Sequence, residues 1–197
     1  MKTFSRLLLG LLIGLSSVSP GQTAQNTASG NYRVDAVMTE GGTLLEGAAA
    51  VYVLDSQGDV VARGHAVPAV FDLGDGDFTA VVVYGHARAR GAIEPVTQAG
   101  ANALNLDAGK VRLDLVKPDG TPVSSADLSW RVDRYRPDAE RGPEVVVTEQ
   151  ARPHLILDAG WYEVRAGHAG QSGASSTREH VIEVKAGREQ TYSIVTD

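Results

Sequence analysis

The sequence predicts an all-β protein built from two tandem antiparallel β-sandwiches. Short segments with alternating apolar and polar residues recur along the chain, and turns rich in Gly and Pro separate them, as is typical of strands. The apolar residues are mostly Val, Ala and Leu, and Gly occurs 22 times in 197 residues. This composition suits many short strands joined by turns, and no long amphipathic helical pattern competes with it.

One sequence motif in the second half of the chain marks a turn and the strand that follows it. Residues 157–166 read Leu-Asp-Ala-Gly-Trp-Tyr-Glu-Val-Arg-Ala. Gly160 can adopt a positive φ without a steric penalty, which suits the turn into a strand. The alternation after this turn predicts one face with Tyr162, Val164 and Ala166, and the opposite face with Trp161, Glu163 and Arg165.

The same motif occurs earlier, in residues 73–84, and other short motifs recur in the same order. Their offsets lie between 77 and 87 residues, as insertions in turns would produce. We therefore predict a flexible lead-in at residues 25–30, a first repeat at residues 31–108 and a second at residues 109–197. The matching motifs are Val34 with Val111, Gly42-Thr43 with Gly120-Thr121, Gly76-Asp77-Phe78 with Gly160-Trp161-Tyr162, Gly85-His86-Ala87 with Gly167-His168-Ala169, and Ala99-Gly100 with Ala186-Gly187.

About seven strands are expected in the first repeat. Residues 32–38 alternate regularly. The alanines of residues 48–55 would suit a helix, but Val51, Val53 and the turn that follows favour a strand. Pro68 restricts its segment to a sheet edge or a bulge. The other expected strands are residues 60–65, 67–71, 78–86, 93–97 and 102–107, of which 78–86 has the strongest pattern.

The second repeat follows the same plan. A strong turn at residues 118–122 reads Pro-Asp-Gly-Thr-Pro. The charged, Pro-containing segment Arg134 to Pro143 and the small-residue segment Gly170 to Thr177 predict exposed loops. The expected strands are residues 111–115, 128–135, 145–148, 154–157, 161–168, 180–185 and 191–196.

The N-terminus predicts export. Lys2 and Arg6 precede the apolar run of residues 7–15, and small residues continue to Ala24, which indicates a secretory signal peptide at residues 1–24. The run is shorter than the ~20 residues of a membrane span, so an uncleaved anchor is the less favoured alternative. The sequence contains no Cys, which suits a bacterial periplasmic or secreted protein stabilised by its core alone.

The charge of the chain limits its partners. The formal net charge is −6 at pH 7, with the acidic residues dispersed, so nucleic acid is not an expected partner. After cleavage of the signal peptide we do not expect an integral membrane protein. An envelope protein or a surface ligand is the expected partner, and the sequence indicates neither its identity nor the oligomeric state.

Three segments of the second repeat carry a family resemblance: Pro118 to Pro122, Leu157 to Val164, and Ala186 to Ile194. Their succession resembles the carboxypeptidase-regulatory-like or prealbumin-like (Ig-like) β-sandwich modules of bacterial surface and periplasmic proteins. It is also similar to the tandem repeats that accompany von Willebrand A-type domains in some exported bacterial proteins. The resemblance implies spacer, binding or assembly modules. Pilin-type relatives carry a Lys to Asn isopeptide bond, which is not expected here because the first repeat has no Lys.

Two groups of residues raise the question of a metal site. Asp72 to Asp77 concentrates three carboxylates and could offer oxygen ligands to calcium, but it lacks the spacing and distal Glu of an EF-hand loop, so a solvated turn is the preferred interpretation. The histidines lack close ligand spacing such as His-x-His, and we expect no metal ligands among them. They are His65, His86, His154, His168 and His180, of which His86 and His168 are equivalent in the two repeats.

Catalytic residues and cofactors are not expected either. Ser172 superficially resembles a nucleophile elbow, but the motif fails because residue 174 is Ala. Four aromatic residues lie in the second repeat: Trp130, Tyr135, Trp161 and Tyr162. Of these, the outward Trp161 could belong to a binding patch or could pack between the repeats.

We expect a non-enzymatic exported protein whose tandem modules serve protein interaction or structural support in the cell envelope. The alternative is a periplasmic module that binds a small ligand or a metal ion. The two predicted loops, 134–143 and 170–177, are the expected contact surfaces, and Trp161 is the residue that the first repeat replaces by Asp77.

Overall fold

A computed structural model describes residues 30–123, 128–139, 141–169 and 175–196. The predicted signal peptide, most of the lead-in, and Ser172 lie outside these residues. Within them the chain forms strands and turns only, without a helix. It follows that this part of the chain holds no helix that could cross a membrane.

The first sandwich contains seven strands. They are β1 (Tyr32–Val37), β2 (Gly47–Leu54), β3 (Val60–Val67), β4 (Ala69–Phe71), β5 (Phe78–Tyr84), β6 (Ala87–Ile93) and β7 (Ala103–Asn105). One sheet has four strands in the order β3-β2-β5-β6, and the other has three in the order β4-β1-β7. Side chains from both sheets share one buried cluster.

The second sandwich repeats this arrangement. Its strands are β8 (Ala108–Val116), β9 (Leu128–Arg134), β10 (Glu144–Thr148), β11 (His154–Asp158), β12 (Gly160–Ala169), β13 (Ser175–Val184) and β14 (Glu189–Val195). The four-stranded sheet has the order β10-β9-β12-β13, and the three-stranded sheet has the order β11-β8-β14. The prediction of an all-β fold with two sandwiches is confirmed.

Most strand pairs are antiparallel, but each three-stranded sheet also contains one parallel pair. β1 lies parallel to β7, and β8 lies parallel to β14. In each sandwich the first strand therefore pairs directly with the last. The second of these ladders is the longer, since it runs from Lys110 opposite Glu189 to Val116 opposite Val195.

Two separate clusters of buried side chains form the cores. The first includes Val34, Val51 and Val82, each fully buried, and ends in the sequence at Ala108. The second begins at Val111 and surrounds the fully buried Trp130.

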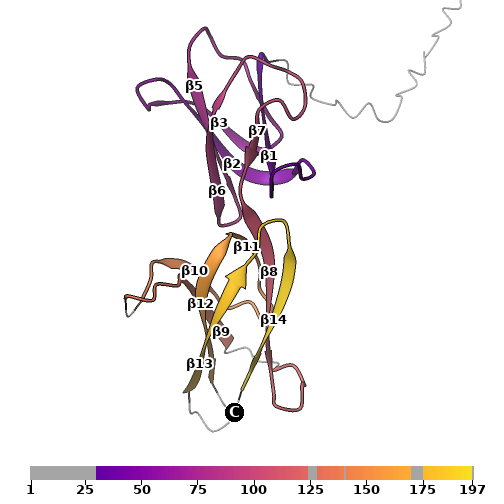
Figure 1. Ribbon diagram of the computed structural model, residues 1–197, viewed down its shortest axis with the longest axis vertical. Coiled ribbons are helices and arrows are strands. Elements are labelled where there is room, and N and C mark those ends of the chain that lie inside the picture. Colours follow the sequence, from indigo (N-terminus) through magenta and orange to yellow (C-terminus); the bar gives the residue numbers. More distant parts are fainter. Residues whose placement is uncertain (1–29, 124–127, 140, 170–174, 197) are drawn as a thin grey trace, which may run out of the picture.

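The two sandwiches are stacked end to end (Figure 1) and hydrogen bonds join them. The Arg88 amide donates to Asp158 Oδ1 over 3.0 Å, and the His86 amide donates to the Ile156 carbonyl over 2.9 Å. In the connection between β7 and β8, the Asp107 carbonyl accepts from the Ala159 amide over 2.7 Å. These bonds restrict rotation about the short connection.

Three predicted boundaries are wrong. The strand expected at residues 93–97 lies at residues 87–93 as β6, because its alternation uses Ala and Gly as inward residues and is weak in hydrophobicity. β13 begins at Ser175, so residues 175–177 of the predicted loop belong to a strand. Arg134 is the last residue of β9, and the predicted loop therefore starts at Tyr135.

Candidate binding site

The outer face of the β10-β9-β12-β13 sheet carries the most distinctive group of exposed side chains. Along β12, Tyr162, Val164 and Ala166 are at most 1% exposed, whereas Trp161 is 53% exposed. The predicted alternation of this strand is confirmed. An indole in this position leaves a large apolar ring in water, which is uncommon away from contact surfaces.

Trp161 lines a hollow of about 530 Å³. Its other lining residues are Arg134, Tyr135, Pro137 and Val181, of which Tyr135 and Val181 are also exposed hydrophobic side chains. The Tyr135 amide donates to the Trp161 carbonyl over 2.9 Å, which fixes the start of the β9–β10 loop against β12. The hollow is therefore bounded by the β9–β10 loop and by the three neighbouring strands β9, β12 and β13.

Arg134 forms the polar side of this hollow. Its Nη2 donates to Asp158 Oδ2 over 2.7 Å, and its Nη1 donates to the Ala159 carbonyl over 3.3 Å. Its guanidinium carbon lies 4.8 Å from the centre of the Tyr162 ring, a cation–π distance. Burial raises the pKa of Tyr162 to about 12, with Arg134 opposing and Asp158 reinforcing this effect.

The shape of the β9–β10 loop depends on Gly142. A Cβ at this position would lie 1.5 Å from the carbonyl oxygen of Arg134. The Arg134 amide also donates to the Pro143 carbonyl over 2.9 Å, so the two ends of the loop touch. Only Gly permits this close approach of the backbone.

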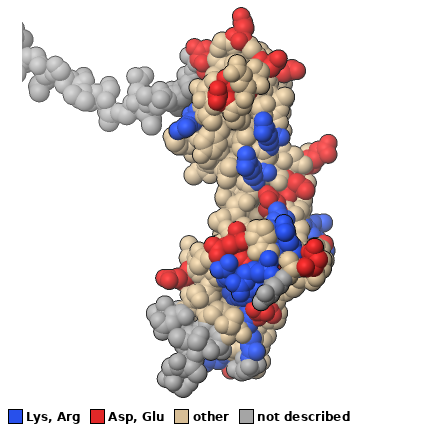
Figure 2. Space-filling model, turned by 90° about the vertical axis from the view of Figure 1, so that its left-hand side faces the viewer, with Lys and Arg blue, Asp and Glu red and all other residues tan. Residues whose placement is uncertain are grey.

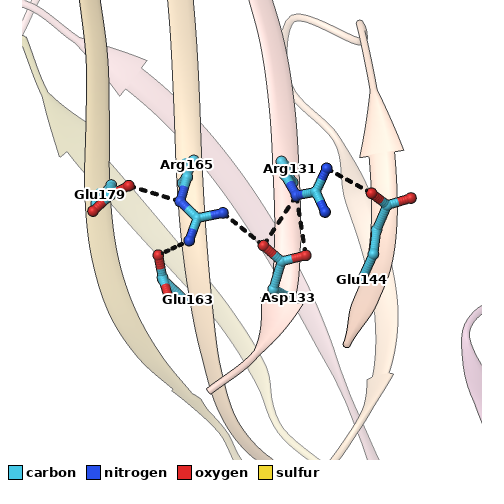
Figure 3. A network of polar contacts seen from close by, with 6 residues as sticks. All are labelled: Arg131, Asp133, Glu144, Glu163, Arg165 and Glu179. Atoms are coloured by element: carbon cyan, nitrogen blue, oxygen red, sulfur yellow. Dashed lines mark hydrogen bonds and ion pairs between the residues drawn. The ribbon is translucent and has the colours of Figure 1, made fainter. Parts of the chain in front are cut away.

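A network of charged side chains crosses the sheet beside the hollow (Figure 3). Arg165 donates to Asp133 Oδ2 over 2.7 Å, to Glu179 Oε1 over 2.7 Å, and to Glu163. Arg131 bridges Asp133 and Glu144, at 3.0 and 2.7 Å respectively. Four strands are thereby connected on their outer face.

The network is held away from water at its centre. Asp133 is fully buried and Arg165 is 8% exposed. Burial lowers the pKa of Arg165, but the hydrogen bonds that its guanidinium donates to Glu179 and Glu163 outweigh this effect and raise the pKa overall. Because these charged groups satisfy one another, they fix the sheet surface around the hollow, which suits recognition.

The structure separates the four aromatic residues that the sequence singled out. Trp130 and Tyr162 lie in the core, at 0% and 1% exposure, whereas Tyr135 and Trp161 meet at the hollow. Packing between the repeats does not explain Trp161, since it faces solvent. Val181 was not predicted as a site residue. It reaches the hollow because β13 pairs with β12, where Val181 lies opposite Glu163.

The candidate metal ligands are dispersed. Asp72 to Asp77 forms the connection between β4 and β5, and His86 lies in the turn between β5 and β6. Among the described residues, no three side chains of His, Cys, Asp or Glu converge as a metal site would require. The expectation that the chain binds no metal stays a prediction.

Comparisons with known proteins add resemblances of fold. No family model matches the sequence, and no curated protein matches it. Several solved structures are similar at low sequence identity. Among them are the Bacillus anthracis TIE protein (18% identity, 84% of this chain and 33% of that chain, TM-score 0.35), a candidate cell adhesion protein of Bacteroides fragilis (9%, 83% and 92%, 0.39) and a minor pilin of Streptococcus agalactiae (13%, 83% and 94%, 0.31). The chain spans a third of the length of the first of these proteins.

Proposed function

We propose that this chain is a non-enzymatic exported protein that acts in protein interaction or structural support in the cell envelope. Its signal peptide would be residues 1–24, and its two modules would divide at residues 108 and 109. They would be modules of the carboxypeptidase-regulatory-like kind in a periplasmic or secreted protein. The observation that carries this proposal is the apolar hollow around Trp161 on the outer face of the second sandwich.

The hollow belongs to one repeat only. The residue equivalent to Trp161 in the first repeat is Asp77, an exposed acidic residue in the turn before β5. Exposed Trp, Tyr and Arg side chains in one hollow match the composition of interface centres. The rigid charged network beside them keeps the surface preorganised, which lowers the entropy lost on binding.

Capture from an envelope extract of the producing organism tests this function. The chain without residues 1–24 would be immobilised as wild type, as Trp161→Ser/Val181→Ser, and as the control Val60→Ser/Val195→Ser. The control changes two exposed hydrophobic residues away from the hollow. We expect wild type and control to retain the same proteins and the first variant to lose them. Identical sets from all three chains would contradict the proposal.

The alternative function, binding of a small ligand, is favoured by the volume of the hollow. About 530 Å³ lies within the range of ~300–1,000 Å³ that ligand sites occupy. Thermal unfolding with a panel of small aromatic and aliphatic compounds, and with calcium and zinc, tests it. A rise in melting temperature that Trp161→Ser removes would support this alternative, and a flat response would contradict it.

A further inference from the structure

The four-stranded sheet of the first sandwich has an unusual distribution of charge. Residues 30–108 contain ten acidic residues, four Arg and no Lys. Nevertheless β2, β3, β5 and β6 contain no Asp or Glu, and they hold three of the four Arg. The acidic residues lie in other strands and in turns, and Figure 2 shows them gathered at the top of this sandwich.

These three Arg share the outer face of the sheet, which we call the cationic face. Arg63 pairs across the strands with Tyr52, Tyr52 with Val81, and Val81 with Arg90, so the four side chains form one row. Arg88 lies two residues before Arg90 on the same side. Tyr52 is 36% exposed, while Val51 and Val53 beside it are fully buried, so the row points outward.

The cations of this row are uncompensated. Arg33 is paired with Asp35 at 3.0 Å, but no ion pair engages Arg63, Arg88 or Arg90 within the described ranges. Given strand spacings of about 4.8 Å, the two ends of the row are about 14 Å apart. A single small anion cannot bridge that distance, so the surface suits an extended acidic partner.

The equivalent sheet of the second sandwich has a small excess of carboxylates, and Arg134 at its hollow is already paired with Asp158. Its outer face, here called the acidic face, has more carboxylates than cations. The carboxylates are Asp133, Glu144, Glu163, Glu179 and Glu183, and the cations paired with them are Arg131, Arg165 and Lys185. Glu144, Glu179 and Glu183 have side chains 41–60% exposed and can accept further hydrogen bonds.

We propose that the cationic face of one molecule docks on the acidic face of a second copy of the chain. Tyr52 would make apolar contacts with Trp161 and Val181. The unpaired guanidinium groups of the cationic face would bind the exposed carboxylates of the acidic face. The inference rests on the proposed function, because it identifies the partner of the hollow. The two faces of one molecule cannot close on each other, because the hydrogen bonds at the junction hold the sandwiches end to end.

Such a contact is heterologous, so each added copy leaves one face of each kind open and the assembly can grow. A face of four strands and about seven residues covers about 450 Å² per partner. Stable pairs bury about 800 Å² per partner, so this association is weak and depends on charge. Assembly is expected at high protein concentration and low salt.

Sedimentation velocity over a concentration series, in low and in high salt, tests the proposal with the chain lacking residues 1–24. Variant A is Arg63→Glu/Arg90→Glu, and variant B is Glu179→Arg/Glu183→Arg. The control Lys110→Glu/Lys117→Glu makes the same change in net charge as variant A at two exposed positions in and just after β8, which belongs to the other sheet and lies outside both faces. Thermal unfolding of each variant confirms that it is folded.

We expect wild type and control to assemble in low salt and to dissociate in high salt. Variants A and B alone should associate at least about tenfold more weakly. An equimolar mixture of A and B should assemble again, because A then has two acidic faces and B two cationic ones. A wild type that stays monomeric, or a variant A that assembles like wild type, would overturn the proposal. If the wild type is monomeric but still captures envelope proteins through Trp161, the proposed function holds and only the self-association is wrong.

Discussion

Asp133 and Arg165 form an ion pair between the neighbouring strands β9 and β12, with 2.7 Å between Oδ2 and Nη1. The carboxylate is fully buried beneath two guanidinium groups, although both residues belong to the outward side of their strands. The side chains of Arg131 and Arg165 therefore cover the Asp133 carboxylate and shield it from water, although it lies on the solvent-facing side of the sheet.

Removing this carboxylate should destabilise the second sandwich strongly. Asp133→Ala leaves Arg165 and Arg131 without their shared partner, and breaking a buried pair in this way costs about 3 kcal/mol. Glu144→Ala, the matched control at the exposed end of the network, should cost less than about 1 kcal/mol. Urea unfolding measures both. A loss below about 1 kcal/mol for Asp133→Ala would show that the network contributes little.

Substitution of Trp130 should reduce stability, whereas substitution of Trp161 should reduce binding. Trp130 is fully buried, so Trp130→Ala should lower the free energy of unfolding by about 3–5 kcal/mol. Trp161 is half exposed, so Trp161→Ser should change the free energy of unfolding by less than about 1 kcal/mol. The same substitution should abolish partner capture. Denaturant unfolding distinguishes the two roles. Strong destabilisation by Trp161→Ser would assign this residue to packing instead of binding.

Gly142 should be the least replaceable residue of the loop beside the hollow. Its Cβ would meet the Arg134 carbonyl, so Gly142→Ala must displace the loop, with a loss of about 2 kcal/mol or more. Gly74 is the control, because its Cβ would meet nothing within 4 Å and its φ is not positive. Gly74→Ala should be neutral or slightly stabilising. Equal stability of the two variants would contradict the importance of this contact.

Asp158 should control the rigidity of the junction. Asp158→Ala removes the acceptor of the Arg88 amide and the ion pair with Arg134. Hydrogen exchange of the Arg88 amide should therefore accelerate by about tenfold or more. Asp119→Ala, in the exposed turn after β8, should leave this rate unchanged. An unchanged rate in Asp158→Ala would mean that the other junction bonds suffice.

Alkaline pH should weaken the fold through Tyr162. Its pKa is about 12 in the folded chain against an ordinary value of 10.0, chiefly because of burial. Between these values the unfolded chain has released the proton and the folded chain retains it, so stability falls as pH rises through this window, by at most about 3 kcal/mol. Tyr162→Phe should lose about 1 kcal/mol at pH 8, through its hydrogen bond to the Asp158 carbonyl. Unfolding at pH 8 and 11 should then show less pH dependence in this variant than in wild type.

The sequence was sufficient for the fold class and for most strands, since apolar alternation and Gly turns are local signals. It missed the position of β6, whose inward residues are Ala87, Ala89 and Gly91, and with it the surface of Arg88 and Arg90. The outward position of Trp161 was predicted correctly from period-2 alternation. The hollow was not predictable, because it depends on the register that places β13 beside β12 and brings Val181 near.

The parallel pairing of first and last strands has a mechanical consequence. In the second sandwich the chain enters along β8 and leaves along β14, which run in the same direction. Tension applied at the two ends would therefore pull these neighbours in opposite directions along their length. All rungs of the ladder from Lys110 to Val116 would share the load in shear, where a hairpin would open one rung at a time. Each sandwich is built to transmit force along the axis on which the two are stacked.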